Sequence, residues 1–342
     1  MTQPVVSTWM YVDDSVTAGH FPQAGGNSSV PEIQAVYWRC VPVFFACAKR
    51  TNPSGCEFLL FTNADTLPII DGVDIGQLLG SFGVRLVRLP FTYVTPQGFF
   101  KSWGNQFYIF DIIKYLHKSD APLGVVLDSD CIINRPLQAV FRATSRNKLL
   151  TYHIEYPPDV RVNGIDRNTM RRIFTEMSGE ETAGVPAYFG GEIFAASTAG
   201  LRELVGLLDD AWHANLDRYR KGLPKCNEEA HLLSYLYWRL GISEGTANPH
   251  IKRMWTQSEY RNVVEADMEK EIWHVPAEKR YGIRHLFRDL PSGILWEFDP
   301  GVPFRAYLAA TLGIPRRTLG KQFVDMVARM RWRARRAITP RR

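Results

Sequence analysis

The chain has 342 residues, of which 45% are hydrophobic and 22% charged, and its net charge is +6, a balance typical of a globular protein with one or two domains. No apolar run reaches the roughly 18 residues that cross a bilayer, and we find no secretion signal at the N-terminus. The five cysteines include no Cys-x-x-Cys pair, which argues against a disulfide framework or a zinc knot. We therefore expect a reducing, cytoplasmic location.

The first part of the chain predicts a strand, a loop and a helix. Residues 7–12 form an apolar run that predicts a strand, and this run ends at two acids, Asp13 and Asp14. A polar, glycine-containing loop should follow. Pro42 is then expected to begin a helix over residues 43–49, because proline is tolerated in the first helical turn.

Two short apolar strands and an amphipathic helix are expected next. The strands cover residues 57–62 and 84–89, and apolar side chains recur at helical spacing over residues 102–118. Strands that alternate with helices indicate an α/β sheet with parallel members. In such sheets ligands bind beyond the carboxyl ends of the strands.

The following apolar run, residues 124–127, ends in Asp128 and Asp130. Residues i and i+2 of an extended chain point to the same side, so a strand end here would deliver two carboxylates to one place. Such carboxylates repel unless a cation or proton lies between them, and oxygen ligands suit Mg²⁺ or Mn²⁺. The alternative is a simple turn or helix cap. Because Asp13 and Asn63 also follow predicted strands, we favour a metal site.

The second half of the chain is less regular but holds three further polar motifs. Helices are predicted over residues 198–219 and 227–240, and a short strand over residues 272–275. The motifs are Gly190-Gly191-Glu192 inside an apolar strand, Asn227-Glu228-Glu229 at a helix start, and His274 followed by Lys279.

The order of these four motifs resembles the nucleotide-sugar-dependent glycosyltransferases of the GT-A fold. Its layout is most similar to the retaining family that includes bacterial lipopolysaccharide galactosyl- and glucosyltransferases and glycogenin, over most of residues 7–285. The resemblance implies an α/β fold with a Rossmann-like mixed sheet flanked by helices. It also implies a catalytic domain over residues 1–290, with a nucleotide-binding half (1–140) and a donor-sugar and acceptor half (141–290), followed by a basic helical extension over residues 291–342.

In that family the Asp-x-Asp holds Mn²⁺ on the donor's diphosphate and a histidine completes the metal site. The resemblance therefore implies Asp128, Asp130 and His274 as ligands of Mn²⁺ or Mg²⁺. The motifs depart from the family where the sugar would bind, since Gly-Gly-Glu replaces Asn-Ala-Gly. Other residues that the resemblance places around the nucleotide and the donor sugar are Asp13, Asp14, Lys101, Asn105, Ser129, Gly190, Gly191, Asn227 and Lys279.

Three glutamates are candidates for the catalytic carboxylate, which would stabilise an oxocarbenium-like transition state or deprotonate the acceptor hydroxyl. We favour Glu228 and Glu229 over Glu192, because they would lie at a helix N-terminus facing the cleft. The alternatives are that the pair only complements the helix dipole and that Glu192 only forms a salt bridge. A divalent ion and Lys279 would neutralise charge on the leaving nucleoside diphosphate.

The C-terminal end is strongly basic, with ten Lys/Arg and one acid in residues 315–342. A helix starting near Thr318 would carry an apolar stripe of Phe323, Val327 and Met330 flanked by arginines, which is typical of an interfacial helix on anionic lipid. Such a tail also attracts nucleic acid, although we expect no specific nucleic-acid partner. We predict peripheral attachment to the inner face of a membrane, with a disordered cationic end as the alternative.

Together these features predict a metal-dependent glycosyltransferase that moves a sugar from a nucleoside diphosphate sugar, by preference a UDP-sugar, to a hydroxyl acceptor. The acceptor would be a saccharide or a lipid-linked sugar, such as a glycolipid or an envelope polysaccharide. Two alternatives remain. One is a sugar-phosphate nucleotidyltransferase, which would need a basic Gly-rich loop after the first strand. The other is a non-enzymatic adaptor that binds membrane or nucleic acid through its tail.

Overall fold

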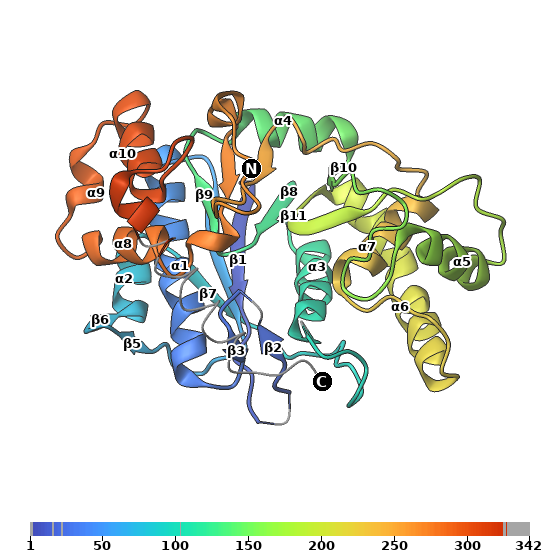
Figure 1. The fold of residues 1–342 in the computed structure, drawn as a ribbon. Coiled ribbons are helices and arrows are strands. Elements are labelled where there is room, and N and C mark those ends of the chain that lie inside the picture. Colours follow the sequence, from blue (N-terminus) through green and yellow to red (C-terminus); the bar gives the residue numbers. More distant parts are fainter. Residues whose placement is uncertain (1–2, 16, 22, 103, 324–325, 327–342) are drawn as a thin grey trace.

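The centre of the molecule is a six-stranded mixed sheet in the order β10-β11-β8-β1-β4-β7 (Figure 1). The structure is a computed structural model that describes residues 3–15, 17–21, 23–102, 104–323 and 326. Strands β8, β1, β4 and β7 run parallel, whereas β11 is antiparallel to β8 and β10. This confirms the predicted α/β fold with a mixed sheet. The six strands are β1 (Val5–Met10), β4 (Glu57–Thr62), β7 (Arg85–Arg88), β8 (Leu123–Leu127), β10 (Leu149–His153) and β11 (Phe189–Ser197).

Helices cover both faces of this sheet, which is why its central strands are apolar on both sides. Helix α1 packs on the face that carries Val6 and Leu60, and helices α3, α6 and α7 pack on the face that carries Val5 and Leu59. The alternation follows from the two-residue period of a strand. The covering helices are α1 (Pro31–Thr51), α3 (Ile109–Lys118), α6 (Thr198–Arg220) and α7 (Glu229–Arg239).

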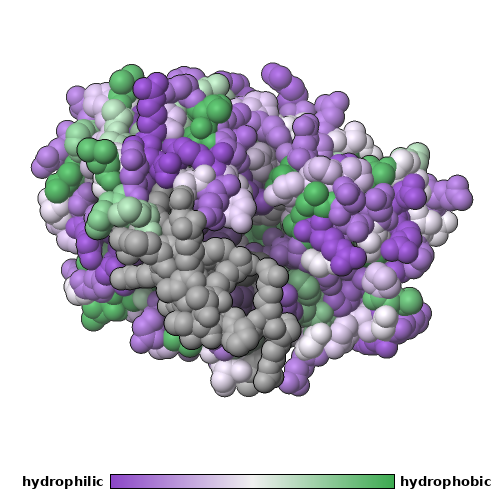
Figure 2. Space-filling view, in the orientation of Figure 1, coloured by the Kyte–Doolittle hydropathy of each residue, from purple (hydrophilic) through white to green (hydrophobic). Residues whose placement is uncertain are grey.

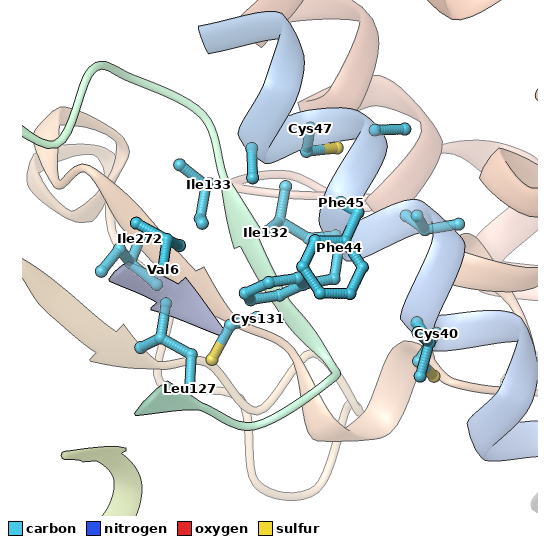
Figure 3. Close-up of a cluster of buried hydrophobic side chains, with 14 of the residues drawn as sticks. Val6, Cys40, Phe44, Phe45, Cys47, Leu127, Cys131, Ile132, Ile133 and Ile272 are labelled. Carbon is cyan, nitrogen blue, oxygen red and sulfur yellow. The ribbon is translucent and has the colours of Figure 1, made fainter. Parts of the chain in front are cut away.

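The prediction that Pro42 begins a helix is wrong, because Pro42 lies inside α1 and Pro31 occupies its first turn. An internal proline costs a helix about 3 kcal/mol. Phe44 and Phe45 follow it and are fully buried, and they pack near Cys131 and Ile132 (Figure 3). Each such burial contributes roughly 1.5–3 kcal/mol, so the core outweighs the local cost of the proline.

A three-stranded sheet, in the order β12-β13-β9, lies at the carboxyl end of β8. The chain leaves β8, turns with a hydrogen bond from Cys131 N to Asp128 O of 3.0 Å, and continues as β9. In the register, His274 of β13 faces Cys131 of β9, and Arg253 of β12 faces His274. This sheet therefore brings the end of β8 together with residues more than 120 positions later. Its strands are β9 (Cys131–Ile133), β12 (Ile251–Arg253) and β13 (Ile272–His274).

The remaining elements surround these two sheets. Helix α8 packs against α1, and α10 packs against α8, so the last helices join the core of the first half. The division at residue 290 falls between α8 and α9 and stays a prediction. The elements are β2 (His20–Phe21), β3 (Gly26–Asn27), β5 (Ile69–Ile70), β6 (Val73–Asp74), α2 (Ile75–Ser81), η1 (Gly104–Tyr108), α4 (Gln138–Asn147), α5 (Arg167–Ser178), η2 (Glu265–Glu269), η3 (Pro276–Glu278), α8 (Gly282–Asp289), α9 (Ile294–Glu297) and α10 (Val302–Leu312).

Most of the predicted interfacial helix, including Val327 and Met330, lies outside the described residues. In the part that is described, a helical turn starts after Thr318, and its Leu319 and Phe323 are 83% and 62% exposed. Lys321 of the same turn is buried instead, 2.9 Å from Glu278. No helix in the described ranges is long and apolar enough to cross a membrane. The face seen in Figure 2 is mainly hydrophilic, with small separate apolar patches.

Candidate active site

A cavity of about 160 Å³ lies beyond the carboxyl ends of β1 and β8. This is the edge at which open α/β sheets bind their ligands. Seven of the predicted site residues with ionisable side chains line it, together with aromatic side chains from β1 and α1 and two residues, Asn105 and Gln106, from η1. The seven are Asp128, Asp130, Glu192, Glu228, Glu229, His274 and Lys279.

The three predicted metal ligands form one cluster. His274 Nε2 lies 3.6 Å from Asp128 Oδ2 and 3.3 Å from Asp130 Oδ2, and one ligand atom of each residue falls within 4.8 Å of the others. Two carboxylates and an imidazole suit Mn²⁺ and Mg²⁺, with the nitrogen favouring Mn²⁺. The donor set therefore fits the divalent ion that the sequence predicts.

Lys279 supplies a buried positive charge beside this cluster. Its Nζ pairs with Asp130 Oδ2, lies 3.0 Å from Gln23 Oε1, and is 5.4 Å from the centre of the Tyr37 ring. The lysine follows η3, and the backbone N–H of Val275 donates to Asp130 O at 3.1 Å. The turn that carries Lys279 is thus fixed directly to the end of β8.

Burial and charge give the two aspartates opposite behaviour. Burial raises the pKa of Asp128 to about 7, and the Asp130 carboxylate adds to this rise. Burial also acts to raise the pKa of Asp130, but Lys279 and then His274 overcome it and hold that pKa well below its usual range. For His274, burial lowers the pKa, yet Asp130 and Glu192 together raise it to about 9.

The two adjacent glutamates at the start of α7 have different surroundings. Glu228 is the N-cap residue, and its carboxylate accepts hydrogen bonds from Tyr188 Oη at 2.9 Å and from Asn163 Nδ2. Glu229 is buried, and its Oε2 has no hydrogen-bond partner among the described residues. Burial, and then the neighbouring Glu228, raise the pKa of Glu229 well above its usual value. Both glutamates line the cavity, and Glu229 is the one with a carboxyl oxygen that has no partner among the described residues.

The Gly190-Gly191 pair makes room for two carboxyl groups. A Cβ atom on Gly190 would overlap Glu192 Oε2, and a Cβ atom on Gly191 would overlap Glu229 Oε1. Both glycines lie in β11, which passes the end of β8. The motif that departs from the family pattern in the sequence thus has a steric reason in this chain.

The residues predicted to bind the nucleotide divide into two groups. Asn105 Nδ2 donates to Asp13 Oδ2 at 2.8 Å, Asp13 Oδ1 is buried without a partner in the described structure, and Asn105 lines the cavity. In contrast, Asp14 is exposed and accepts from Thr17 N at 2.8 Å. Lys101 is exposed too and does not line the cavity. Asn105 thus lies at the cavity with Asp13 bound behind it, and Asp14 and Lys101 are exposed away from it.

The last two predicted donor-binding residues are Ser129, which lines the cavity, and Asn227, which does not. Asn227 Nδ2 donates to Asn163 O at 3.0 Å, and its Oδ1 accepts from Lys225 Nζ at 2.6 Å. Asn227 therefore holds the loop around Asn163, which does line the cavity.

Asp13 should lower the stability of the fold at neutral pH. Burial raises its pKa from 3.8 to about 6, so the folded protein prefers the neutral acid, and stability is lost as pH rises through 6. Asp13→Asn cannot ionise. Between pH 4 and pH 8 we expect the difference in unfolding free energy to move by about 2–3 kcal/mol in favour of Asp13→Asn. Urea unfolding at both pH values measures it, and an unchanged difference would contradict the buried-acid interpretation.

Sequence reasoning missed several residues of the cavity wall, of which Arg253 is the most informative. Its guanidinium group pairs with Glu192 through Nε–Oε1 and Nη2–Oε2 distances of 2.7 Å. A signal was present, because a glutamate inside an apolar strand needs a buried cation. The other missed residues include Gln23, Tyr37, Asn163 and Tyr188.

A second cavity of about 940 Å³ adjoins the first and shares Arg253 and Trp255 with it. Three tyrosines line it together with polar side chains from the segment that follows β12. The tyrosines are Tyr152, Tyr156 and Tyr260. Both cavities therefore combine aromatic rings with charged and polar side chains, and the candidate metal ligands line the first.

No protein-family model matches this chain, and no curated protein matches it. Among solved structures it is similar to the galactosyltransferase LgtC in complex with donor and acceptor sugar analogues, with a TM-score of 0.48 and 11% identity over 84% of this chain and 95% of that chain. An active-site mutant of LgtC gives the same values. Mouse xyloside xylosyltransferase 1 in its apo form gives a TM-score of 0.46 and 12% identity over 80% and 97%. Identities this low carry no assignment of activity.

Proposed function

We propose that this protein is a metal-dependent glycosyltransferase that moves a sugar from a nucleoside diphosphate sugar to a hydroxyl acceptor. The observation that carries the proposal is the cluster of Asp128, Asp130 and His274 beside the buried Lys279, at the carboxyl ends of parallel strands. When bound there, a divalent ion supplies positive charge to the diphosphate oxygens of the donor. The three ligand residues would hold that ion.

Lys279 neutralises the leaving group in this proposal. The bond between the anomeric carbon and the diphosphate oxygen breaks, and its electron pair stays on the diphosphate. Lys279 Nζ already lies against Asp130 in a buried position, so a diphosphate at the cluster would come within its reach. A fixed ammonium group in a site shielded from water stabilises developing negative charge strongly.

Glu229 is the carboxyl group that we assign to the donor sugar. Glu229 lines the cavity and its buried Oε2 has no partner among the described residues, whereas the oxygens of Glu228 already accept from Tyr188 and Asn163. In the protonated form that burial favours, Glu229 donates a hydrogen bond to a sugar hydroxyl. In the ionised form it balances the positive charge that develops at the anomeric carbon. Glu228 is then a positioning residue for the start of α7.

The second cavity is the proposed acceptor site. Aromatic rings pack against the apolar faces of sugar rings, and mixed polar side chains hydrogen-bond the hydroxyls. Trp255 belongs to both cavities, so an acceptor seated on Tyr152 and Tyr156 would extend toward the donor. This composition favours a saccharide or the sugar of a lipid-linked acceptor.

The test is a screen of UDP-sugars and other nucleoside diphosphate sugars for hydrolysis and transfer, with Mn²⁺ or Mg²⁺ and with EDTA. We expect product with one class of donor, loss of activity with EDTA, and recovery with added metal. Pyrophosphate release from a nucleoside triphosphate and a sugar phosphate would instead identify a nucleotidyltransferase. Tryptophan fluorescence measures the binding of nucleoside diphosphates. If none of them binds, both enzymatic proposals are contradicted and the adaptor is favoured.

We also propose that the C-terminal end attaches the enzyme to an anionic membrane surface. Leu319 and Phe323 are exposed apolar side chains on one helical turn, and the chain beyond them is rich in arginine. Sedimentation with vesicles should show binding to phosphatidylglycerol and little to phosphatidylcholine. The double variant Leu319→Ser, Phe323→Ser should bind at least about tenfold more weakly. Equal binding of both proteins would contradict the proposal.

A further inference from the structure

Glu192 has a position that a surface salt bridge would not need. Strand β11 runs beside β8, and the backbone N–H of Asp128 donates to Glu192 O at 3.1 Å. The Glu192 side chain is completely buried, and Arg253 binds both of its oxygens at 2.7 Å. A bidentate guanidinium–carboxylate pair fixes the plane as well as the position of the carboxylate.

The same carboxylate faces the imidazole of the metal cluster. Glu192 Oε1 lies 3.5 Å from His274 Nδ1, a buried ring nitrogen that has no hydrogen-bond partner among the described residues. The other ring nitrogen, Nε2, faces the carboxylates of Asp128 and Asp130. Arg253 is held in place as well, because β12 pairs with β13 in a register that sets Arg253 beside His274.

We infer that Glu192 and Arg253 are positioning residues of the metal centre, in which Arg253 fixes Glu192 and Glu192 orients His274 with Nε2 toward the metal. The inference rests on the metal site of the proposed function. A histidine that binds a metal through one nitrogen commonly donates its other N–H to a carboxylate, which sets the tautomer and the ring orientation. Glu192 accordingly does not touch the reacting atoms, and it leaves the group of candidate catalytic carboxylates.

The glycine before this unit supports its close packing. A Cβ atom on Gly190 would lie 2.9 Å from Arg253 Nη2 and would overlap the Glu192 carboxylate. The backbone N–H of Arg253 also donates to Tyr152 Oη at 3.0 Å, which ties the unit to β10. Gly190, Glu192 and Arg253 thus form one arrangement, and the Gly-Gly-Glu motif provides space for it.

The test measures Mn²⁺ binding without any donor, by electron paramagnetic resonance of the free ion. Two double variants of similar size separate orientation from charge: Glu192→Gln with Arg253→Met keeps a carbonyl that can accept from Nδ1, and Glu192→Leu with Arg253→Met does not. We expect the Gln variant within about threefold of the wild-type Kd and the Leu variant about 10- to 100-fold weaker. Thermal unfolding shows whether each variant is folded.

Combining the Leu variant with His274→Ala tests whether the loss of Mn²⁺ affinity acts through His274, which a merely structural role would not require. Adding His274→Ala to the Leu variant should cost no further affinity, because the lost orientation and the lost ligand are one effect. Glu271→Gln is the matched control, since Glu271 pairs with His250 Nδ1 at 3.2 Å just before β13 and β12 begin, and it should bind Mn²⁺ like the wild type. Equal affinity of the Gln and Leu variants, or additive losses with His274→Ala, would overturn the inference. Absence of Mn²⁺ binding to the wild type would instead overturn the metal site itself.

Discussion

Asp130→Asn should lower the rate of sugar transfer by about a hundredfold or more at saturating donor. Asp130 contacts both positively charged groups of the site, since its Oδ2 lies 3.3 Å from His274 Nε2 and pairs with Lys279. Asparagine keeps the size of the side chain but removes the charge, so it weakens the ion's attachment and releases the lysine. The loss of preorganised charge at a leaving group is worth about this factor.

The measurement is the rate of UDP-sugar turnover together with the Mn²⁺ Kd of the same protein. Asp209→Asn is the control, because Asp209 also pairs with a lysine, at 2.7 Å. Asp209 lies on α6, and its side chain is half-exposed. We expect the control to keep wild-type activity. Asp130→Asn with full activity and intact metal binding would show that the aspartates are not the metal ligands.

The strands could be predicted from sequence because burial on both faces leaves a clear apolar pattern. The run before Asp128 is the clearest case, and β8 (Leu123–Leu127) is buried at every position. Pro42 misled the prediction because local propensity suggests a helix start, whereas the packing of Phe44 and Phe45 is a property of the whole fold. The spacing of apolar residues indicates reliably which positions are buried. It does not show whether core packing will outweigh an unfavourable local residue, such as a proline inside a helix.

The clustering of the three candidate metal ligands could be predicted from the sequence, but the roles of the glutamates could not. Asp128 and Asp130 lie two positions apart and carry their own signal, and the order of motifs suggested His274. Two neighbouring acids in a helix start look equivalent in sequence, and both line the cavity, but Tyr188 and Asn163 bind the Glu228 carboxylate, whereas Glu229 Oε2 has no partner among the described residues. Such differences depend on the direction of each side chain, which spacing alone does not fix.

The ion pair between Lys279 and Asp130 has a consequence for the order of binding. An ion that arrives alone must compete with the lysine for the Asp130 carboxylate. A metal ion that arrives with a diphosphate meets a different balance, because the phosphate oxygens offer Lys279 a new partner. Metal and donor should therefore bind cooperatively, with each raising the affinity for the other.

Lys279→Met should separate the two roles of this lysine by changing metal binding and catalysis in opposite directions. Without donor, loss of the competing positive charge beside Asp130 should strengthen Mn²⁺ binding by about tenfold. With donor bound, loss of the ammonium group at the leaving diphosphate should lower the transfer rate roughly 100- to 1000-fold. Methionine keeps most of the length of the side chain and its packing against Tyr37.

Lys321→Met provides the matched control for this experiment, because Lys321 is also a buried lysine and pairs with Glu278, the residue next to Lys279, at 2.9 Å. It should leave the Mn²⁺ Kd unchanged even where it lowers the melting temperature. If Lys279→Met weakens metal binding and catalysis together, the lysine supports the fold of the turn rather than the leaving group. A purely structural role of Lys279 would lower both the Mn²⁺ affinity and the transfer rate. A higher Mn²⁺ affinity together with a lower transfer rate is expected only if the Lys279 ammonium group pairs with Asp130 before the donor binds and with the diphosphate afterwards.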